Sequence, residues 1–390
     1  MKNRILITQY VLVFLILASC KESPEEANHM AAVLQEVKDE FAPDKRVALF
    51  DITTIKNGDT FVLKGESNLP DALEALKNRL FADSIPFTDS IQTLPAADLG
   101  RNTKGIINIS VANLRSNPSH SAELATQSTL GTIVNVYKKK DNWYYVQTPD
   151  HYLAWVDDGG FELVDEQKAE NWSVDEKVIY TKTYGHAYLG PDENGPIVSD
   201  LTAGSLVTIV KYTDKHFIVR FPDGRNAYIS RNEAESYNDW LKNKNATNET
   251  LVSTAQKLMG IPYLWGGTST KGADCSGFTK TVYFLNGMLI PRDASQQVHA
   301  GTAIDSTGNF DNLEKGDLLF FGRKATDTTA EKVVHVGMWI GNDEFIHSSG
   351  KVRISSMNKS SRNFDDYNLK RYLRTKRIFK QVDKDLIDLK

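Results

Sequence analysis

The chain has little of what several protein classes require. Its 390 residues include only two cysteines, which excludes a disulfide framework and a cysteine-rich zinc site. Basic residues number 46 and acidic residues 50, so there is no basic excess to displace counterions from nucleic acid. A single apolar run is long enough to consider for a membrane, which excludes a protein with several spans. With 41% hydrophobic residues, the chain can instead bury the cores of roughly two to four domains.

The apolar run lies at the N-terminus and is typical of a secretion signal. Residues 1–4 are basic at two positions, and the apolar run over 5–17 is shorter than the about 20 residues of a membrane helix. The Leu-Ala-Ser-Cys sequence that ends at Cys20 resembles a bacterial lipobox, which implies lipidation of that cysteine. A plain secretory signal without lipid is the alternative. We therefore predict a signal peptide over 1–20 and a lipid-anchored envelope protein that faces the periplasm or the cell surface.

Residues 21–100 are predicted to form a linker and a small domain. The charged segment 21–45 favours a linker with some helix. Two strand-like runs, 47–52 and 60–63, flank a turn, and a proline starts a predicted helix over 70–81. This β-β-α unit carries no residue pattern that indicates chemistry.

The middle of the chain contains an internal repeat with an offset of 73 residues. Gly131 falls on Gly204, and a Pro-Asp turn recurs at the same spacing. Short alternating strands with such turns predict two small β-barrels, at 101–165 and 166–244, whereas a solenoid needs about three or more units. The first copy resembles a bacterial SH3 domain, and the second is a more divergent version.

Cys275 lies where a helix is predicted to begin. Phe278, Val282 and Leu285 follow it at helical spacing. The dipole and the free N–H groups at a helix start stabilise a thiolate, which is the nucleophilic form of cysteine. Because helix starts tend to be exposed, we interpret Cys275 as a candidate nucleophile rather than a core cysteine.

Two of the eight histidines lie in one predicted β-hairpin. Residues 333–340 alternate like a strand, a turn follows near Gly341, and 345–347 return. With that turn, His335 and His347 come opposite each other on the same face of the hairpin. One imidazole can then serve as a base for the thiol while the other orients it.

The region after residue 245 carries five motifs in order. They are Tyr263–Gly267, Asp274–Phe278, Ile290–Arg292, Lys315–Phe321 and His335–Gly337. Together they resemble the NlpC/p60-type cysteine peptidases, whose fold is papain-like and whose substrates are bacterial cell-wall peptides. The resemblance implies Cys275 as nucleophile, His335 as base and then acid, and His347 as the residue that orients the base. It also implies Tyr263 as an oxyanion donor beside the Cys275 N–H, and neither a metal nor a cofactor.

The order of two SH3-like domains followed by this peptidase resembles γ-D-glutamyl-L-diamino acid endopeptidases, which act on peptidoglycan stem peptides. In those enzymes the first SH3 domain walls the cleft and acidic groups bind the free amine of an N-terminal L-alanine. The resemblance implies these substrate-binding residues: Glu123, Tyr152, Trp265, Asp274, Ser276, Asp293 and Ser295. An ammonium in a closed site needs anionic partners, which Glu123 and Asp293 can supply. Asp293 is alternatively a turn residue, and Ser295 a helix cap.

We therefore expect an α+β protein in which a papain-like domain at 245–390 follows two SH3-like barrels and a small N-terminal α/β unit. Its expected activity is hydrolysis of the bond between γ-D-glutamate and the diamino acid, by a monomer. The alternatives are an amidase or a thiol acyltransferase on the same fold, and a non-catalytic wall-binding lipoprotein. A free-amine preference would follow from the acidic residues.

Overall fold

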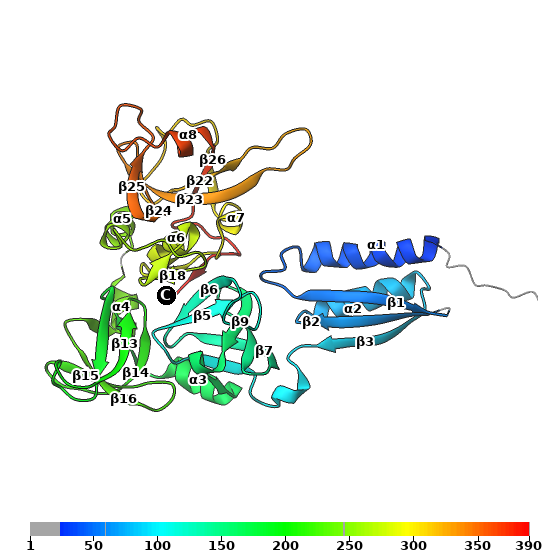
Figure 1. The fold of residues 1–390 in the computed structure, drawn as a ribbon, viewed down its shortest axis with the longest axis horizontal. Coiled ribbons are helices and arrows are strands. Elements are labelled where there is room, and N and C mark those ends of the chain that lie inside the picture. The colour runs from blue at the N-terminus through cyan, green and yellow to red at the C-terminus, as the bar shows by residue number, and fades with distance from the viewer. Residues whose placement is uncertain (1–23, 59, 245, 390) are drawn as a thin grey trace, which may run out of the picture.

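The computed structural model describes residues 24–58, 60–244 and 246–389, which form an α+β arrangement of four units (Figure 1). The predicted fold class is confirmed. The predicted signal peptide and Cys20 lie outside the described residues. Among the helices that are described, none combines the length and apolarity needed to cross a membrane.

The N-terminal unit is a three-stranded sheet with two helices packed on it. Its elements are α1 (Pro24–Phe41), β1 (Phe50–Asn57), β2 (Thr60–Ser67), α2 (Pro70–Ala82) and β3 (Phe87–Thr93), in the sheet order β1-β2-β3. Met30, Val33 and Val37 of α1 are buried in its core. The helix expected within 21–45 is therefore present, but it packs into a core and the segment is not a linker over most of its length. Apolar residues three and four positions apart give this charged segment one face that the sheet buries.

The two middle units are barrels built from the predicted repeat. The first contains η1 (Ala97–Leu99), β4 (Lys104–Ile107), β5 (Val111–Arg115), β6 (Leu124–Thr129), β7 (Ile133–Lys140), β8 (Trp143–Gln147), β9 (Leu153–Asp157), η2 (Asp158–Gly160) and β10 (Phe161–Val164). The second contains α3 (Glu166–Val174), β11 (Lys177–Tyr180), β12 (Tyr184–Tyr188), β13 (Ile197–Thr202), β14 (Leu206–Tyr212), β15 (His216–Arg220), β16 (Asn226–Ser230), β17 (Ala234–Ser236) and α4 (Tyr237–Asn243). Strands β7, β8 and β9 each begin 73 residues before β14, β15 and β16, so the repeat is confirmed as a structural one.

Equivalent glycines join consecutive units. Gly131 of the first barrel has φ +85°, and a Cβ there would lie 2.3 Å from the Leu206 carbonyl oxygen of the second barrel. Gly204 of the second barrel has φ +89°, and a Cβ there would lie 2.4 Å from the Phe284 ring of the C-terminal unit. A side chain does not fit at either contact, so both positions require glycine. Each barrel therefore contacts the following unit at the equivalent position of the repeat.

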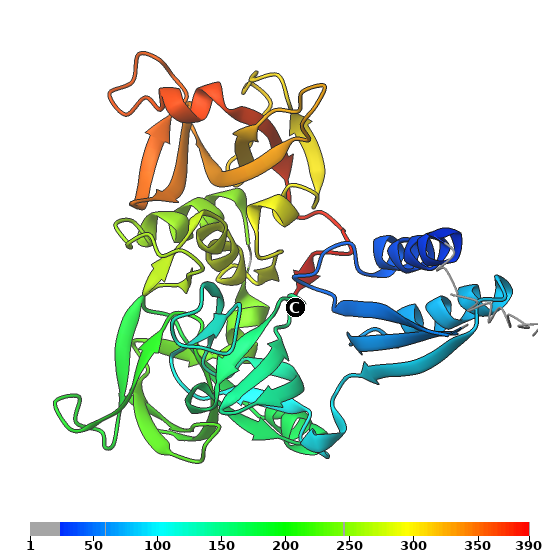
Figure 2. The same ribbon diagram turned by 45° about the vertical axis from the view of Figure 1, so that its right-hand side comes forward.

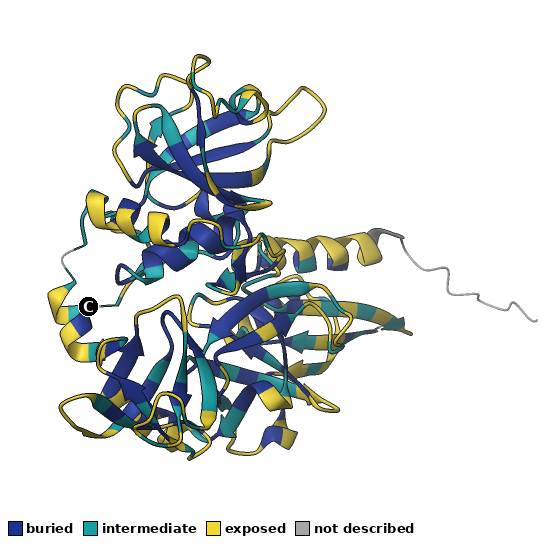
Figure 3. Cartoon of the chain, turned by 60° about the vertical axis from the view of Figure 1, so that its left-hand side comes forward, coloured by how far each residue is buried: buried dark blue, intermediate teal, exposed yellow. Residues whose placement is uncertain are grey.

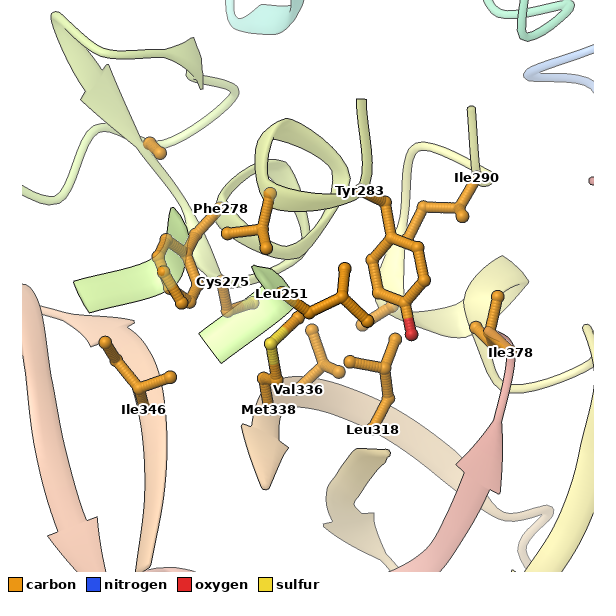
Figure 4. Packing of buried hydrophobic residues seen from close by; sticks show 14 of the residues in the cluster. Leu251, Cys275, Phe278, Tyr283, Ile290, Leu318, Val336, Met338, Ile346 and Ile378 are labelled. Carbon is orange, nitrogen blue, oxygen red and sulfur yellow. The ribbon is translucent and has the colours of Figure 1, made fainter. Parts of the chain in front are cut away.

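The C-terminal unit is a six-stranded antiparallel sheet with helices packed against it. Its elements are α5 (Asn248–Lys257), β18 (Thr268–Ser269), β19 (Gly272–Ala273), α6 (Cys275–Phe284), β20 (Met288–Leu289), α7 (Ala294–Gln297), β21 (Thr302–Asp305), β22 (Leu318–Arg323), β23 (Lys332–Gly341), β24 (Glu344–Ser349), β25 (Lys351–Ser356), α8 (Asp366–Lys370), β26 (Tyr372–Arg377) and β27 (Ile387–Asp388). The sheet order is β21-β26-β22-β23-β24-β25, and its central strands are mostly buried (Figure 3). Val336 and Met338 of β23 share a core with Cys275 and Phe278 of α6 (Figure 4).

Candidate active site

The α6 helix positions the thiol. It begins at Cys275 because the Asp274 side chain caps it and accepts a hydrogen bond from the Gly277 N–H at 2.7 Å. Gly277 has to be a glycine, because a Cβ there would lie 1.9 Å from the Gly267 carbonyl oxygen. The predicted helix start is confirmed, and Cys275 is a free cysteine.

Burial makes Cys275 a neutral thiol. The residue is 8% exposed, and burial, together with the Asp274 carboxylate, raises the pKa of the thiol to about 11. Backbone hydrogen bonds from Val336 and Ser276 act in the opposite direction but are weaker. The expectation that this helix start is exposed is wrong, because α6 packs Cys275 into the core. The bond from Val336 also ties the sulfur to the strand that carries His335.

The two histidines lie on adjacent strands and are hydrogen-bonded. Nε2 of His335 on β23 lies 2.7 Å from Nδ1 of His347 on β24. Met338 pairs with Ile346, so the same register continued along the strands sets His347 across from Gly337 rather than from His335. The predicted shared face is confirmed, but the pair is diagonal because the turn is centred one residue later than expected.

Gly337 makes the diagonal pair possible. A Cβ at this position would lie 3.2 Å from the His347 Cβ and 2.7 Å from the Phe345 ring. Without a side chain at Gly337, the ring of His347 has room to reach toward His335. Both rings are buried, at 7% and 0% exposure for His335 and His347.

A chain of hydrogen bonds continues from the histidines to a carboxylate. His347 Nε2 lies 3.0 Å from Ser355 Oγ, and the Ser355 hydroxyl is hydrogen-bonded to Asp365. An ionised carboxylate only accepts, so Ser355 donates to Asp365 and its oxygen accepts from His347 Nε2–H. The Nδ1 of His347 is then free of a proton and accepts Nε2–H of His335. Because the proton of neutral His335 is then on Nε2, its Nδ1 is unprotonated and can accept a thiol proton.

Burial also keeps the imidazoles neutral. It lowers the pKa of His335 well below its usual 6.5, and the neighbouring His347 contributes in the same direction. It lowers the pKa of His347 to about 4, with Arg353 adding to the effect and Asp365 opposing it. Burial therefore favours the neutral thiol and the uncharged rings, and an uncharged His335 can act as a base.

Tyr263 lies close enough to couple electrostatically to the thiol. Burial raises the pKa of its hydroxyl to about 12, and the charges of Cys275 and Asp274 contribute in the same direction. The hydroxyl therefore keeps its proton at neutral pH and remains a hydrogen-bond donor. This is the property that an oxyanion donor requires.

A buried arginine binds the residues on both sides of the thiol. Arg292 is 1% exposed and its Nη2 lies 2.6 Å from Asp274 Oδ2, while its Nη1 lies 3.1 Å from Ser276 Oγ. Its Nε bonds to Thr126 of the first barrel at 3.1 Å. Asp274 and Ser276 are themselves buried and belong to this internal network, and their expected contact with substrate stays a prediction.

The other predicted substrate residues form two pairs of contacts between the first barrel and the C-terminal unit. Glu123 accepts a hydrogen bond from the indole N–H of Trp265 at 2.6 Å, and Trp265 is 62% exposed. The Tyr152 hydroxyl donates to Asp293 Oδ2 at 3.1 Å. Ser295 does not cap α7; its hydroxyl bonds to Arg46 of the N-terminal unit at 2.9 Å.

Asp293 is the residue that links these contacts to the thiol. One of its carboxylate oxygens lies 3.7 Å from Arg292, which in turn binds Asp274 beside Cys275. Asp293 also precedes α7 as its N-cap residue, the position that the alternative reading had given to Ser295, and its role toward substrate stays a prediction. In the described residues, no group of three or more His, Cys, Asp and Glu is arranged to hold a metal.

Three residues of the site were not predicted from the sequence. Ser355 and Asp365 complete the hydrogen-bond chain of the histidines, and Arg46 pairs with Asp293 at 2.7 Å. Ser355 follows His347 across the next hairpin, so strand alternation alone could have placed it on the same face. No local pattern marks Arg46, because its partner is 247 residues away in the chain.

Comparison with protein families agrees with these positions. A model of the NlpC/P60 family matches residues 260–370, which include Cys275, His335 and His347. A model described as the bacterial dipeptidyl-peptidase Sh3 domain matches residues 114–160, which include Glu123 and Tyr152. The resemblances predicted from the motifs and from the first barrel are confirmed.

Individual relatives extend over both regions. The chain is 31% identical over 238 residues to a γ-D-glutamyl-L-lysine dipeptidyl-peptidase of Bacillus cereus, covering 59% of this chain and 68% of that protein. It is 38% identical over 233 residues to the Bacillus subtilis protein of the same name, covering 58% and 72%. A crystal structure of an NlpC/P60 family protein from Bacillus cereus matches with a TM-score of 0.60 and 25% identity, covering 70% of this chain and 99% of that one.

Proposed function

The chain belongs to the NlpC/P60 family of cysteine peptidases, and from this premise we propose that it hydrolyses the amide bond between γ-D-glutamate and the diamino acid of peptidoglycan stem peptides. We propose further that the preferred peptides carry a free N-terminal L-alanine. The observation that carries this proposal is the meeting of Asp293 with Tyr152 of the first barrel, near the thiol. Two relatives are named for the γ-D-glutamyl-L-lysine bond, which supports the choice of substrate.

The proposed reaction uses a neutral thiol and a neutral base. Cys275 attacks the γ-carbonyl carbon while Nδ1 of His335 takes the thiol proton. The Cys275 N–H and the Tyr263 hydroxyl stabilise the oxyanion of the tetrahedral intermediate. The imidazolium then gives its proton to the leaving amine, and a water molecule hydrolyses the thioester with His335 again as base. His347 holds the His335 ring in the tautomer that this sequence requires.

A defined tripeptide tests the proposed bond. Mass spectrometry of L-Ala-γ-D-Glu-L-Lys and its diaminopimelate counterpart after incubation should find L-Ala-D-Glu and the free diamino acid. An amidase would leave the tripeptide intact and would act only on stems joined to sugar. A thiol acyltransferase would transfer the L-Ala-γ-D-Glu acyl group to an added amine. A wall-binding module would give no product.

Replacing Asp365 by asparagine should lower kcat by about tenfold or more, with little change in KM. An amide can donate to Ser355, which reverses the hydrogen-bond chain and moves the proton of His335 to the wrong nitrogen. Asparagine still caps helix α8, where the Asp365 side chain accepts the Asn368 N–H at 3.0 Å, so the fold is kept. Ser355→Thr retains the hydroxyl and serves as the control. A wild-type kcat in Asp365→Asn would show that the carboxylate does not set the tautomer.

Acetylating the L-alanine amine of the tripeptide should lower kcat/KM about ten- to hundredfold, the effect of losing a charge-assisted hydrogen bond. The difference between the two peptides should shrink in Asp293→Asn, mainly because the free-amine peptide becomes a poorer substrate. Asp327→Asn, in the exposed loop between β22 and β23, is the matched control and should keep the wild-type difference. Equal rates on both peptides in the wild-type protein would mean a hydrolase without an amine requirement.

We also propose that Cys20, outside the described residues, carries a lipid that anchors a monomeric protein in the cell envelope. The family and its peptidoglycan-processing relatives support an envelope location. Replacing Cys20 by alanine should release the protein from membranes or stall its processing, as fractionation would show. Membrane attachment that persists in this variant after a salt wash would point to a different anchor.

A further inference from the structure

A guanidinium from the N-terminal unit occupies the carboxylate of the proposed amine site. Nη1 of Arg46 lies 2.7 Å from Asp293 Oδ2 and 2.9 Å from Ser295 Oγ. The same Asp293 oxygen accepts the Tyr152 hydroxyl at 3.1 Å. Two of the expected substrate-binding residues, Asp293 and Ser295, therefore already contact a cation of the chain itself, and Tyr152 shares the same carboxylate oxygen.

Arg46 is held in this position by a second carboxylate. Asp44 accepts from Nε of Arg46 at 2.8 Å and from Nη2 at 2.7 Å, a bidentate contact that fixes the plane of the guanidinium. Gln296 donates to the same Asp44 side chain at 2.8 Å. Asp44 thus aims Arg46 at Asp293, and the third guanidinium nitrogen remains for the site.

The backbone around Arg46 is also docked. Its carbonyl accepts the Leu153 N–H of β9 at 2.7 Å, and the Val47 carbonyl accepts from Gln147 of β8 at 2.9 Å. Figure 2 shows the loop after α1 reaching from the N-terminal unit toward the C-terminal unit. The side chain therefore extends from a segment that the first barrel fixes, rather than from a free loop.

The Asp293 carboxylate has little capacity left for a substrate ammonium. One oxygen of its carboxylate already accepts two donors, and the other lies 3.7 Å from Arg292. A substrate ammonium that approaches Asp293 must displace the guanidinium or share a carboxylate that is already neutralised. Arg46 is 34% and Asp293 26% exposed at the side chain, so solvent can reach the pair and exchange is feasible.

We propose that Arg46 is a specificity-determining residue, a built-in cation that competes with the substrate amine for Asp293 and so limits the preference for a free N-terminus. This inference rests on the proposed function. It also gives the N-terminal unit a role in selecting the substrate. Peptides that lack the amine do not compete with Arg46, and their turnover depends less on it.

The test compares kcat/KM for the free tripeptide L-Ala-γ-D-Glu-L-Lys and its N-acetyl form in full-length variants. In Arg46→Gln the ratio of the two values should rise about fivefold, the size expected for a partly exposed ion pair. Arg46→Lys keeps the positive charge and should stay near the wild-type ratio. Glu66→Gln breaks the ion pair of Glu66 with Lys138, another contact between the N-terminal unit and the first barrel, and controls for loosened docking.

An unchanged or lower ratio in Arg46→Gln would overturn the inference, because the arginine would then support the site instead of competing for it. A ratio that rises equally in Glu66→Gln would also overturn it, since docking alone would be the cause. If the wild-type protein released no L-Ala-D-Glu, the proposed function would fail by itself. Calorimetric binding of the dipeptide L-Ala-γ-D-Glu to the full chain would then still test the competition, with tighter binding expected in Arg46→Gln.

Discussion

Replacing Cys275 by serine should reduce turnover of the stem tripeptide by at least about a thousandfold while the fold is kept. Burial and Asp274 already raise the pKa of the thiol to about 11, and burial lowers the pKa of the base, His335, well below 6.5. Proton transfer from sulfur to this weak base is therefore uphill. A serine hydroxyl is a much weaker acid than a thiol, so the same transfer from oxygen is far less favourable.

Kinetics on the tripeptide and the thermal midpoint of the variant check this expectation together. The raised thiol pKa adds a second measurement, because alkylation of Cys275 by iodoacetamide should be slow near neutral pH and accelerate toward pH 11. His335→Ala is the matched variant and should lose turnover to a similar extent, since the two residues act as one unit. If Cys275→Ser kept more than about one thirtieth of the wild-type activity, Cys275 would be excluded as the nucleophile.

Replacing Arg292 by methionine should destabilise the C-terminal unit by about 3–5 kcal/mol, because it leaves the buried Asp274 without its counter-ion. Arg292 is 1% exposed at the side chain and Asp274 is 10% exposed, so water cannot take over the contact. The loss should appear as a lower unfolding midpoint. Adding Asp274→Asn should restore part of it, since asparagine removes the unpaired charge and can still cap α6.

Arg374 provides the control for this prediction. It pairs with Glu331 at 2.6 Å, but its side chain is 40% exposed, so Arg374→Met should cost under about 1 kcal/mol. Equal destabilisation in the two variants would show that the buried pair contributes no more than a surface one. Arg292→Met should also lower activity, because Asp274 fixes the start of the helix that carries Cys275.

The chemistry of the site was predictable where local rules apply. A helix start at Cys275 follows from the apolar spacing after it, and the structure adds Asp274 as the cap. The shared face of His335 and His347 follows from strand alternation, which a one-residue error in the turn shifted along the strand without reversing the face. Moving the turn centre by one residue shifts the strand register by two residues, and a shift of two leaves each side chain on the same face.

Properties that depend on burial or on distant segments were not predictable. The thiol pKa depends on how deeply α6 packs against β23, which no residue near Cys275 specifies. The segment 24–41 is charged enough to suggest a linker, and only the sheet that it covers makes it a buried helix. Arg46 and Asp293 meet because two units dock, and that docking leaves no trace in either local sequence.

The equivalent glycines have a consequence for how such a chain can grow. Gly131 and Gly204 occupy the same place in the repeat, yet one receives the second barrel and the other receives the C-terminal unit. A duplicated barrel would carry the same glycine, and so the same position for close contact with the unit that follows it. A barrel inserted between the N-terminal unit and the first barrel would instead move Arg46 away from Leu153 and from Asp293, so a repeat gained there would remove the contact between this arginine and the site.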